Sequence, residues 1–336
     1  MKWIFTLNFL ASKAGFFFGI LLLIPLTSWS LNLESENVRD FINQLETTHG
    51  FERKYIEQKL ENTEFKQSII DAISRPAEGV LTWGKYRNIF IQPERILAGV
   101  EFFKAHKETI EKIGKETGVP PEILLGIIGV ESYYGRFTGK YKVIDALVTL
   151  GFNYPPRAKF FLSELSHVFR LAREEGIELD TFMGSYAGAM GPPQFIPSSY
   201  RAYAVDGDGD GKRDLLSNWD DILHSVANYF VEHNWQEGKP VATIASTMNK
   251  DQALPFNTKL KLESTIFELK RSGVIFSTTL EENNAAGIWE LEGNKGKELW
   301  VGFQNLYVIT RYNRSIMYAL ATWQLGQAVI KQTSVE

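Results

Sequence analysis

The stretch ILLGIIGVESYYG, residues 123–135, sets a single carboxylate, Glu131, at the end of an almost wholly apolar run. Pro121 suits the first position of a helix, and the glycine after the two tyrosines provides an exit. The run therefore predicts a buried helix from Pro121 to Tyr134. Helical spacing places three apolar residues on the same face as the carboxylate: Leu124, Ile127 and Ile128.

A carboxylate on that face constrains the chemistry of the chain. Removing water from Glu131 disfavours the anion and raises the pKa of the carboxyl group, which makes a general acid at neutral pH. This residue alone leaves an unpaired acid at the boundary of the core as one of two interpretations, and the motifs described below favour it. The other interpretation, which is the more common case for a single glutamate, is a residue at a helix end that pairs with Arg136 or lies in water.

The composition is that of an ordinary globular protein of two or three domains. Of the 336 residues, 44% are hydrophobic and 23% are charged. The formal net charge of -4 provides no basic surface, so nucleic acid is not an expected partner. The sequence contains no cysteine, which excludes disulfides, thiolate chemistry and a lipid-modified N-terminal cysteine.

Residues 1–30 are typical of an export signal. Lys2 and Lys13 form a basic segment, the apolar run AGFFFGILLLIPL follows, and small residues flank a cleavage point near Ser30. The apolar run is shorter than the roughly 20 residues that span a bilayer. We expect an exported protein in the periplasm, with retention of the segment as a membrane anchor as the less favoured alternative.

The rest of the sequence predicts mostly helices. One amphipathic helix follows Asn37 and stops at Gly50, and another runs without a break from Gln92 to Gly118. Further helices are expected over 157–175, 219–233 and 315–331. Between the first two of these, GSYAGAMGPPQFIPSSY predicts a loop with short helical turns at most.

In the segment 241–312, strand patterns replace the helical patterns of the rest of the chain. GIWELEG and KELWVGF predict two strands around a turn, and NLYVITRY predicts another strand. We expect five parts: an export signal at 1–30, a helical N-terminal region at 31–118, a catalytic core at 119–240, a small β region at 241–312, and a C-terminal helix at 313–336 that packs on the core.

Six short motifs occur in order along the chain: GVESYYG, FNYP, GAMG, QF, PSS and SVANYF. Together they resemble the lytic murein transglycosylase B family, glycoside hydrolase family 103, from Trp83 to Ala321. The resemblance implies a mainly α, α+β fold with a lysozyme-like catalytic core, a helical N-terminal region and a small β region. It also implies cleavage of the β-1,4 bond between N-acetylmuramic acid and N-acetylglucosamine in peptidoglycan.

The resemblance also assigns residues. Glu131 matches the catalytic acid, and Ser185 and Gln194 match polar residues that line the cleft beside it. Arg157 matches one of two adjacent basic residues that meet acidic groups of the substrate, but Pro156 replaces the other. Five residues match those that shape the sugar subsites: Tyr86, Tyr229, Tyr312, Asn313 and Tyr318. Each tyrosine could instead serve ordinary core packing.

Most glycosidases use two carboxylates, whereas the resemblance implies one. Glu131 would protonate the glycosidic oxygen and then, as a carboxylate, take the proton from the muramyl C6 hydroxyl that attacks C1. The product is 1,6-anhydromuramic acid, and no water is consumed. The alternatives are a hydrolysing muramidase and a catalytically idle peptidoglycan-binding protein. We expect a monomer whose partners are peptidoglycan glycan strands and proteins of cell-wall synthesis or hydrolysis.

The stretch DGDGDGKRD follows the spacing of an EF-hand loop. Its acidic residues occupy positions one, three, five and nine: Asp206, Asp208, Asp210 and Asp214. Gly211 stands at position six, and the Lys212 carbonyl would be a backbone ligand. Ser217 replaces the bidentate Glu, so a later carboxylate, Asp221 in preference to Asp220, would close the site. We expect structural calcium (Ca2+) and no catalytic cofactor; the alternative is a solvated Asp/Gly turn.

Overall fold

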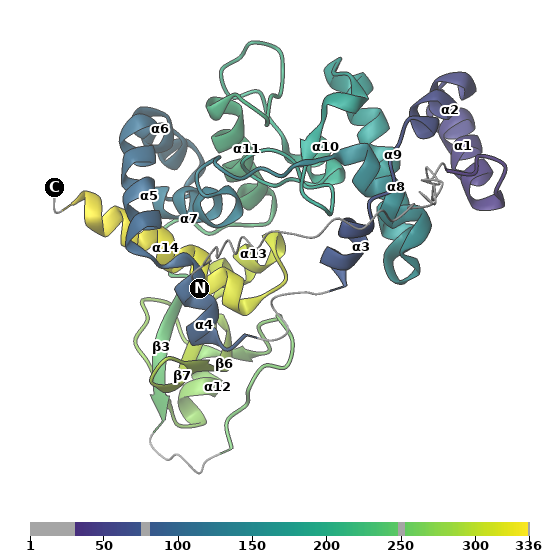
Figure 1. The fold of residues 1–336 in the computed structure, drawn as a ribbon. Coiled ribbons are helices and arrows are strands. Elements are labelled where there is room, and N and C mark those ends of the chain that lie inside the picture. The colour runs from purple at the N-terminus through teal and green to yellow at the C-terminus, as the bar shows by residue number, and fades with distance from the viewer. Residues whose placement is uncertain (1–30, 75–80, 248–252, 335–336) are drawn as a thin grey trace, which may run out of the picture.

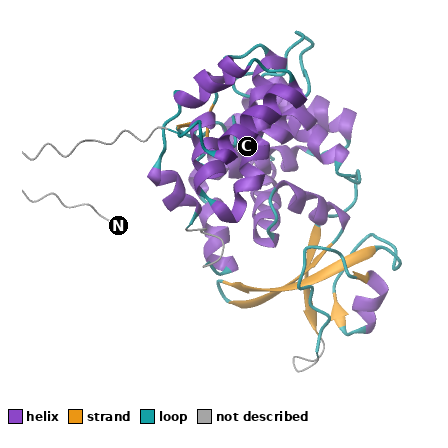
Figure 2. Ribbon diagram, turned by 90° about the vertical axis from the view of Figure 1, so that its right-hand side faces the viewer, coloured by secondary structure: helices purple, strands orange, loops and turns teal. Residues whose placement is uncertain are grey.

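The computed structural model describes residues 31–74, 81–247 and 253–334, so the export signal expected at 1–30 lies outside the described residues. A helical body makes up most of the molecule, and a sheet lies at one end of it (Figure 1). Figure 2 shows the long strands gathered in that one region. Within the described ranges, no helix has the length and apolar character needed to cross a membrane.

Some helices of the body follow one another closely, whereas long segments separate α9 from α10 and α10 from α11. The first six are α1 (Glu36–His49), α2 (Arg53–Glu61), α3 (Gln67–Ile73), α4 (Trp83–Phe90), α5 (Pro93–Ala105) and α6 (Lys107–Thr117). The next five are α7 (Pro121–Ser132), α8 (Val143–Asn153), α9 (Ala158–Glu175), α10 (Pro197–Tyr203) and α11 (Trp219–Glu232). Single 3-10 turns lie at Pro155–Arg157 and Leu179–Thr181, and two short strands, β1 (Tyr141–Lys142) and β2 (Met183–Gly184), pair antiparallel.

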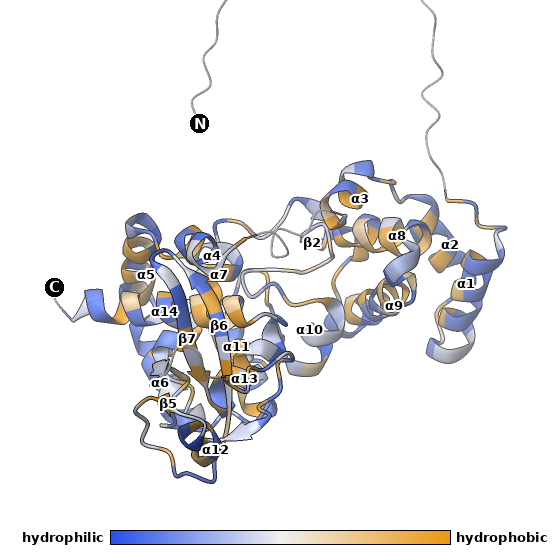
Figure 3. Cartoon of the chain, turned by 90° about the horizontal axis from the view of Figure 1, so that it is seen from below, coloured by the Kyte–Doolittle hydropathy of each residue, from blue (hydrophilic) through white to orange (hydrophobic). Residues whose placement is uncertain are grey.

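Several predicted helices are confirmed. The helices expected over 157–175, 219–233 and 315–331 are α9, α11 and α14 (Ile316–Thr333). Helix α1 stops at Gly50, which adopts a left-handed φ of 66° that glycine tolerates without strain. In Figure 3, α1 and α9 carry both hydrophilic and hydrophobic residues along their length, as the amphipathic patterns predict.

The prediction of one unbroken helix from Gln92 to Gly118 is wrong, because the helix divides into α5 and α6 at His106. The backbone there leaves the helical region, with φ −120° and ψ 22°. The His106 ring lies 4.5 Å from the ring centre of Phe102 and 5.3 Å from that of Trp219. The contact with Trp219 is tertiary, and no Gly or Pro marks the break in the sequence.

The β region forms a five-stranded antiparallel sheet in the order β4-β6-β7-β3-β5. Its elements are β3 (Ala242–Thr247), β4 (Ser264–Thr265), α12 (Ile266–Arg271), β5 (Val274–Ile275), β6 (Ala285–Gly293) and β7 (Gly296–Gly302). The two strands predicted from GIWELEG and KELWVGF are confirmed as β6 and β7, which join through a tight turn at 293–296.

The third predicted strand, NLYVITRY, is wrong because the segment forms helix α13 (Gln304–Tyr312). Leu306 and Ile309 are buried together with Asn305, a spacing of three and four residues that suits one helical face. A short apolar run fits a strand and a helix almost equally well, so tertiary packing decides between them.

Helices α7 and α14 lie antiparallel with their backbones in direct contact. A Cβ atom added to Gly126 would lie 2.2 Å from the Thr322 carbonyl oxygen, and one added to Gly326 would lie 1.7 Å from the Glu122 carbonyl oxygen. Only glycine leaves room for such an approach. The two contacts fix the register of the helices, and the same register brings the start of α14 opposite Glu131.

Candidate active site

Glu131 lies in the last turn of α7 and is partly buried. The hydroxyl of Tyr318, in the first turn of α14, donates a hydrogen bond to Glu131 Oε1. The expectation of an unpaired acid is therefore wrong. The guanidinium of Arg136 lies 3.9 Å from a Glu101 carboxylate oxygen and packs over the Tyr133 ring.

Two tyrosines, Tyr318, which is buried, and Tyr312, which is partly buried, share the electrostatic environment of Glu131. Tyr318 is 2% exposed, and burial followed by the negative charge of Glu131 raises the pKa of its hydroxyl well above the ordinary value. The same two causes, in the same order, raise the pKa of Tyr312. Both hydroxyls therefore stay protonated through neutral pH, so that Tyr318 remains a donor to the carboxylate.

The chain leaves α7 through an unusual backbone. Tyr133 (φ 53°), Tyr134 (φ 59°) and Gly135 (φ 82°) are left-handed in succession, whereas the prediction extended the helix to Tyr134. Left-handed tyrosines cost free energy and persist where surrounding contacts hold them. Arg95 supplies such contacts: its guanidinium donates to the Gly129 carbonyl at 2.8 Å and lies 4.6 Å from the Tyr133 ring centre.

The loop that carries Ser185 packs against the chain that follows α7. A Cβ atom on Gly139 would lie 2.4 Å from the Ser185 backbone nitrogen, so the two backbones touch. Ser185 Oγ accepts hydrogen bonds from the backbone N–H groups of Ala187 and Ala189, each at 3.2 Å. These bonds occupy its acceptor sites and leave the hydroxyl hydrogen to be donated.

Gln194 is held in a related way. Its φ of 51° is left-handed, and its Nε2 donates to the Thr138 carbonyl at 3.1 Å and to the Gly191 carbonyl at 2.8 Å. With both amide hydrogens engaged, the side-chain oxygen is the group left for a ligand. Thr138 follows α7, so one short segment links Glu131, Ser185 and Gln194.

Most of the predicted sugar-binding tyrosines are buried. Tyr229 is 7% exposed, packs 4.8 Å from the Tyr312 ring centre and 5.8 Å from that of Phe195, and donates its hydroxyl to the Arg311 carbonyl at 2.6 Å. The hydroxyl of Tyr312 donates to the Pro193 carbonyl at 2.6 Å, next to Gln194. The structure thus brings Glu131, Tyr312, Tyr318 and Gln194 into one neighbourhood.

The three remaining residues predicted to bind substrate are Tyr86, Arg157 and Asn313. Tyr86 on α4 is 4% exposed and lies 5.2 Å from the Phe90 ring centre. Arg157 is exposed before α9, with its guanidinium 4.3 Å from the Phe160 ring centre. Asn313 ends α13, and its backbone carbonyl accepts a hydrogen bond from Ser315 at 2.8 Å.

The sequence interpretation missed several supports of the site. Glu164 on α9 is buried and accepts a hydrogen bond from Ser198 N–H at 2.8 Å, which fixes the start of α10 after the Gln194 loop. Burial raises the pKa of this carboxyl group. Arg95 and the glycines of the α7–α14 contact were also missed. The available signal was a glycine inside each apolar helix, which often marks a close backbone approach.

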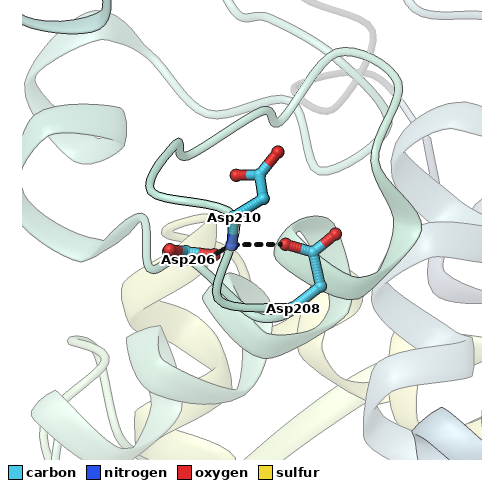
Figure 4. Close-up of side chains that lie close together, drawn as sticks. All are labelled: Asp206, Asp208 and Asp210. Carbon is cyan, nitrogen blue, oxygen red and sulfur yellow. Dashed lines mark hydrogen bonds between the residues drawn. The ribbon is translucent and has the colours of Figure 1, made fainter.

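In the acidic loop, Asp206, Asp208 and Asp210 each place a carboxylate oxygen within 4.8 Å of the others. Figure 4 shows the three side chains around one turn, with the Asp210 N–H directed at Asp208. Asp206 also accepts hydrogen bonds from Gly209 N–H at 2.7 Å and Gly211 N–H at 2.8 Å. A cluster of three carboxylates on alternate residues suits a hard cation such as calcium.

Asp221 lies outside that group. It is fully buried, and its two oxygens accept the N–H groups of Gly207 and Asp214, each at 2.7 Å. Burial raises the pKa of its carboxyl group. The other candidate, Asp220, accepts a hydrogen bond from the Thr109 hydroxyl at 2.9 Å. Asp221 therefore ties the two ends of the acidic loop to the start of α11.

Comparisons with known proteins agree over most of the chain. Residues 34–327 match the family described as Transglycosylase SLT domain. The membrane-bound lytic murein transglycosylase B of Escherichia coli (strain K12) is 39% identical over 304 residues, which cover 87% of this chain and 82% of that protein.

Solved structures show the same similarity. Catenated lytic transglycosylase SltB1 from Pseudomonas aeruginosa is 44% identical, with a TM-score of 0.86 over 89% of this chain and 98% of that one. Escherichia coli Slt35 in complex with calcium is 38% identical, with a TM-score of 0.80, and the match covers 90% of this chain and 95% of that one. SltB3 from Pseudomonas aeruginosa in complex with NAG-anhNAM-pentapeptide is 26% identical, with a TM-score of 0.71, and the match covers 87% of this chain and 78% of that one.

Proposed function

The chain belongs to the lytic transglycosylases with a Transglycosylase SLT domain, enzymes of peptidoglycan, and we propose that Glu131 is its single catalytic carboxylate. The observation that carries this proposal is the hydrogen bond from the Tyr318 hydroxyl to Glu131. It holds a partly buried carboxyl group in one orientation at the end of α7. A fixed orientation favours proton transfer to and from one substrate position.

The proposed reaction has two proton transfers. Glu131 donates its proton to the glycosidic oxygen between N-acetylmuramic acid and N-acetylglucosamine as that bond breaks. The resulting carboxylate then takes the proton of the muramyl C6 hydroxyl while its oxygen bonds to C1. The product is a 1,6-anhydro ring, and the carboxyl group regains its proton. Because the nucleophile is tethered to the reacting sugar, proximity favours this attack over that of water.

Ser185 and Gln194 would orient the sugar. The Ser185 hydroxyl has a hydrogen to donate, which suits the carbonyl oxygen of the N-acetyl group, and the Gln194 side-chain oxygen suits an N–H or hydroxyl donor. An N-acetyl oxygen held in place can in turn ease the positive charge that develops at C1. Asn313 and the exposed Arg157 would contact neighbouring sugars and acidic groups. Tyr86, Tyr229 and Tyr312 would shape the subsites through the edges of their largely buried rings.

Solubilisation of purified murein separates this proposal from a catalytically idle binding protein. The proposal expects soluble muropeptides to appear in proportion to enzyme concentration and time. Binding to murein without release of soluble fragments would support the idle protein instead.

Replacing Tyr318 by Phe is expected to lower kcat about 10- to 150-fold and to leave KM within about twofold. The substitution removes one hydrogen bond to a charged group, which contributes roughly 1.5–3 kcal/mol, and keeps the ring packing. The raised pKa of Tyr318 further predicts that wild-type activity is not lost by ionisation of this tyrosine up to about pH 10. Steady-state kinetics on soluble glycan strands measures both effects. An unchanged kcat in Tyr318→Phe would show that the hydrogen bond does not position the acid.

The proposed location is the periplasm, where peptidoglycan lies. The basic and apolar character of residues 1–30 supports export. The Escherichia coli relative is described as membrane-bound, so attachment to the membrane through that segment is the alternative for this chain.

The acidic loop is proposed to hold structural calcium through Asp206, Asp208 and Asp210, with the Lys212 carbonyl as a further ligand. The clustered carboxylates support this, and Escherichia coli Slt35 was solved in complex with calcium. Asp221 was expected to close the site. In the described structure its oxygens accept two backbone N–H groups, so its proposed role as a ligand requires that one of them be released.

Calcium is expected to raise the free energy of unfolding by about 2.7 kcal/mol at one hundred times its Kd. Asp208→Asn should weaken calcium binding at least tenfold, because a charged ligand is lost. Asp40→Asn, at an exposed position on α1, should bind as the wild type does. Isothermal titration calorimetry and thermal melts with and without a chelator measure these effects. Absence of both binding heat and a shift in Tm would contradict the calcium proposal.

A further inference from the structure

A cavity of about 500 Å³ lies between α1 and α9, lined by residues other than those proposed for catalysis. Both helices lie in the same part of the helical body (Figure 1). Lys159 and Arg170 contribute positive charges from α9, and His49 and His167 contribute imidazoles. Gln44 adds an amide and Leu162 an apolar wall, and no carboxylate is found among the described residues that line the cavity.

The positive charge of this cavity is only partly balanced within the described part of the chain, by Glu174 on the same helix. Glu174 is engaged by Arg201, with N–O distances of 2.7 Å. Arg170 is partly buried and has no hydrogen bond or ion pair among the described residues. Burial, followed by the positive charge of Arg201, lowers the pKa of Arg170, and the negative charge of Glu174 opposes this shift.

The two histidines act as neutral groups at neutral pH. Burial and then nearby arginines lower the pKa of both, with Glu174 opposing this at His167. Arg201 lies 2.7 Å from His167 Nδ1, and because a guanidinium can only donate, Nδ1 must accept. The proton of His167 is therefore on Nε2, which is left as a donor. The cavity combines a free guanidinium, an ammonium and neutral donors.

These groups match the end of a peptide. The flat guanidinium of Arg170 pairs with both oxygens of a carboxylate, and Leu162 offers an apolar contact to a small methyl side chain. The volume accommodates a residue or two in addition to the charged group. Lys159 lies in the first turn of α9, next to the exposed Arg157.

We propose that this cavity binds the D-alanine carboxy terminus of a peptidoglycan stem peptide, at a site separate from Glu131. The inference rests on the proposed function, which makes peptidoglycan the substrate. It gives the enzyme a second contact with the cell wall, so that a peptide of the network is held while a glycan strand is cut.

Isothermal titration calorimetry with the free tetrapeptide L-Ala-γ-D-Glu-diaminopimelate-D-Ala, without sugar, tests the proposal. The full-length protein should bind this peptide, and Arg170→Gln and Lys159→Gln should each raise Kd at least tenfold. Lys54→Gln removes one positive charge from an exposed position on α2 and should stay within twofold of the wild type. Glu131→Gln should also bind as the wild type does. The same peptide with its last carboxyl group amidated should bind at least tenfold more weakly.

Four outcomes would overturn the inference. The first is equal binding of the amidated peptide. The second is unchanged binding by both cavity variants with unaltered thermal melts. The third is competition by inorganic phosphate at a concentration equal to that of the peptide, which would indicate a general oxyanion site. The fourth is that the protein binds no peptide but binds anionic phospholipid vesicles, and that Arg170→Gln loses this vesicle binding. If 1,6-anhydro products still form, any of these results removes this inference and leaves the proposed function intact.

Discussion

Glu131→Gln is expected to lower turnover of murein by about 10³-fold or more while leaving affinity for glycan strands within about twofold. General acid–base catalysis contributes roughly 10²–10⁴-fold, and here one group serves both proton transfers. The amide has nearly the same shape and can still accept the hydrogen bond from Tyr318 through its oxygen. Release of soluble muropeptides and binding to insoluble murein measure the two quantities separately.

The matched control for this variant lies on the same helix. Glu122→Gln removes a carboxylate from the first turn of α7, at the end opposite Glu131. It should reduce stability by less than about 1 kcal/mol through the helix dipole and leave turnover unchanged. Near-normal turnover in Glu131→Gln, or an equal loss in both variants, would remove Glu131 from the proposed mechanism.

Gly126→Ala is expected to destabilise the fold by about 3 kcal/mol, because overpacking a closed contact typically costs about 1–3 kcal/mol or more. The added methyl group would lie 2.2 Å from the Thr322 carbonyl oxygen, and a backbone atom cannot rotate away. The helices must separate, which moves Tyr318 away from Glu131. We therefore expect a second effect, a loss of kcat of tenfold or more in the protein that still folds.

Gly114→Ala is the matched control for this effect. Gly114 lies inside α6, and a Cβ atom there would have its nearest neighbour at 3.5 Å, an ordinary contact distance. Alanine favours the helix by up to about 1 kcal/mol over glycine, so this variant should be neutral or slightly more stable. Denaturant unfolding measures both changes. Wild-type stability and kcat in Gly126→Ala would contradict the proposal that the contact between α7 and α14 positions Tyr318 against Glu131.

The sequence predicted those parts of the fold that depend on local pattern. Helical spacing and end residues were enough for α1, α9, α11 and α14, and alternation with turn residues was enough for β6 and β7. Helix α13 was misjudged because a short run such as NLYVITRY fits either period. The break at His106 was missed because no Gly or Pro marks it and because the contact of His106 with Trp219 is distant in sequence.

In the candidate site, too, the features that depend on local pattern were predicted and those that depend on tertiary contacts were missed. The apolar face of α7 indicated that Glu131 lies at the boundary of the core, and the structure agrees in leaving it partly buried. Its partner, Tyr318, is 187 residues away along the chain, and its position depends on the glycine contacts between α7 and α14. Similarly, the spacing of Asp206, Asp208 and Asp210 predicted their clustering, whereas the burial of Asp221 depends on how the loop closes on α11.

The most direct test of the proposed reaction is the mass of the muropeptides that the enzyme releases from purified murein in water enriched in ¹⁸O. Attack by the C6 hydroxyl consumes no water, so we expect muramic ends that lack the mass of one water and carry no ¹⁸O. Reducing muramic ends that carry one ¹⁸O atom would show attack by water and contradict the proposed role of Glu131 as the base for an intramolecular reaction.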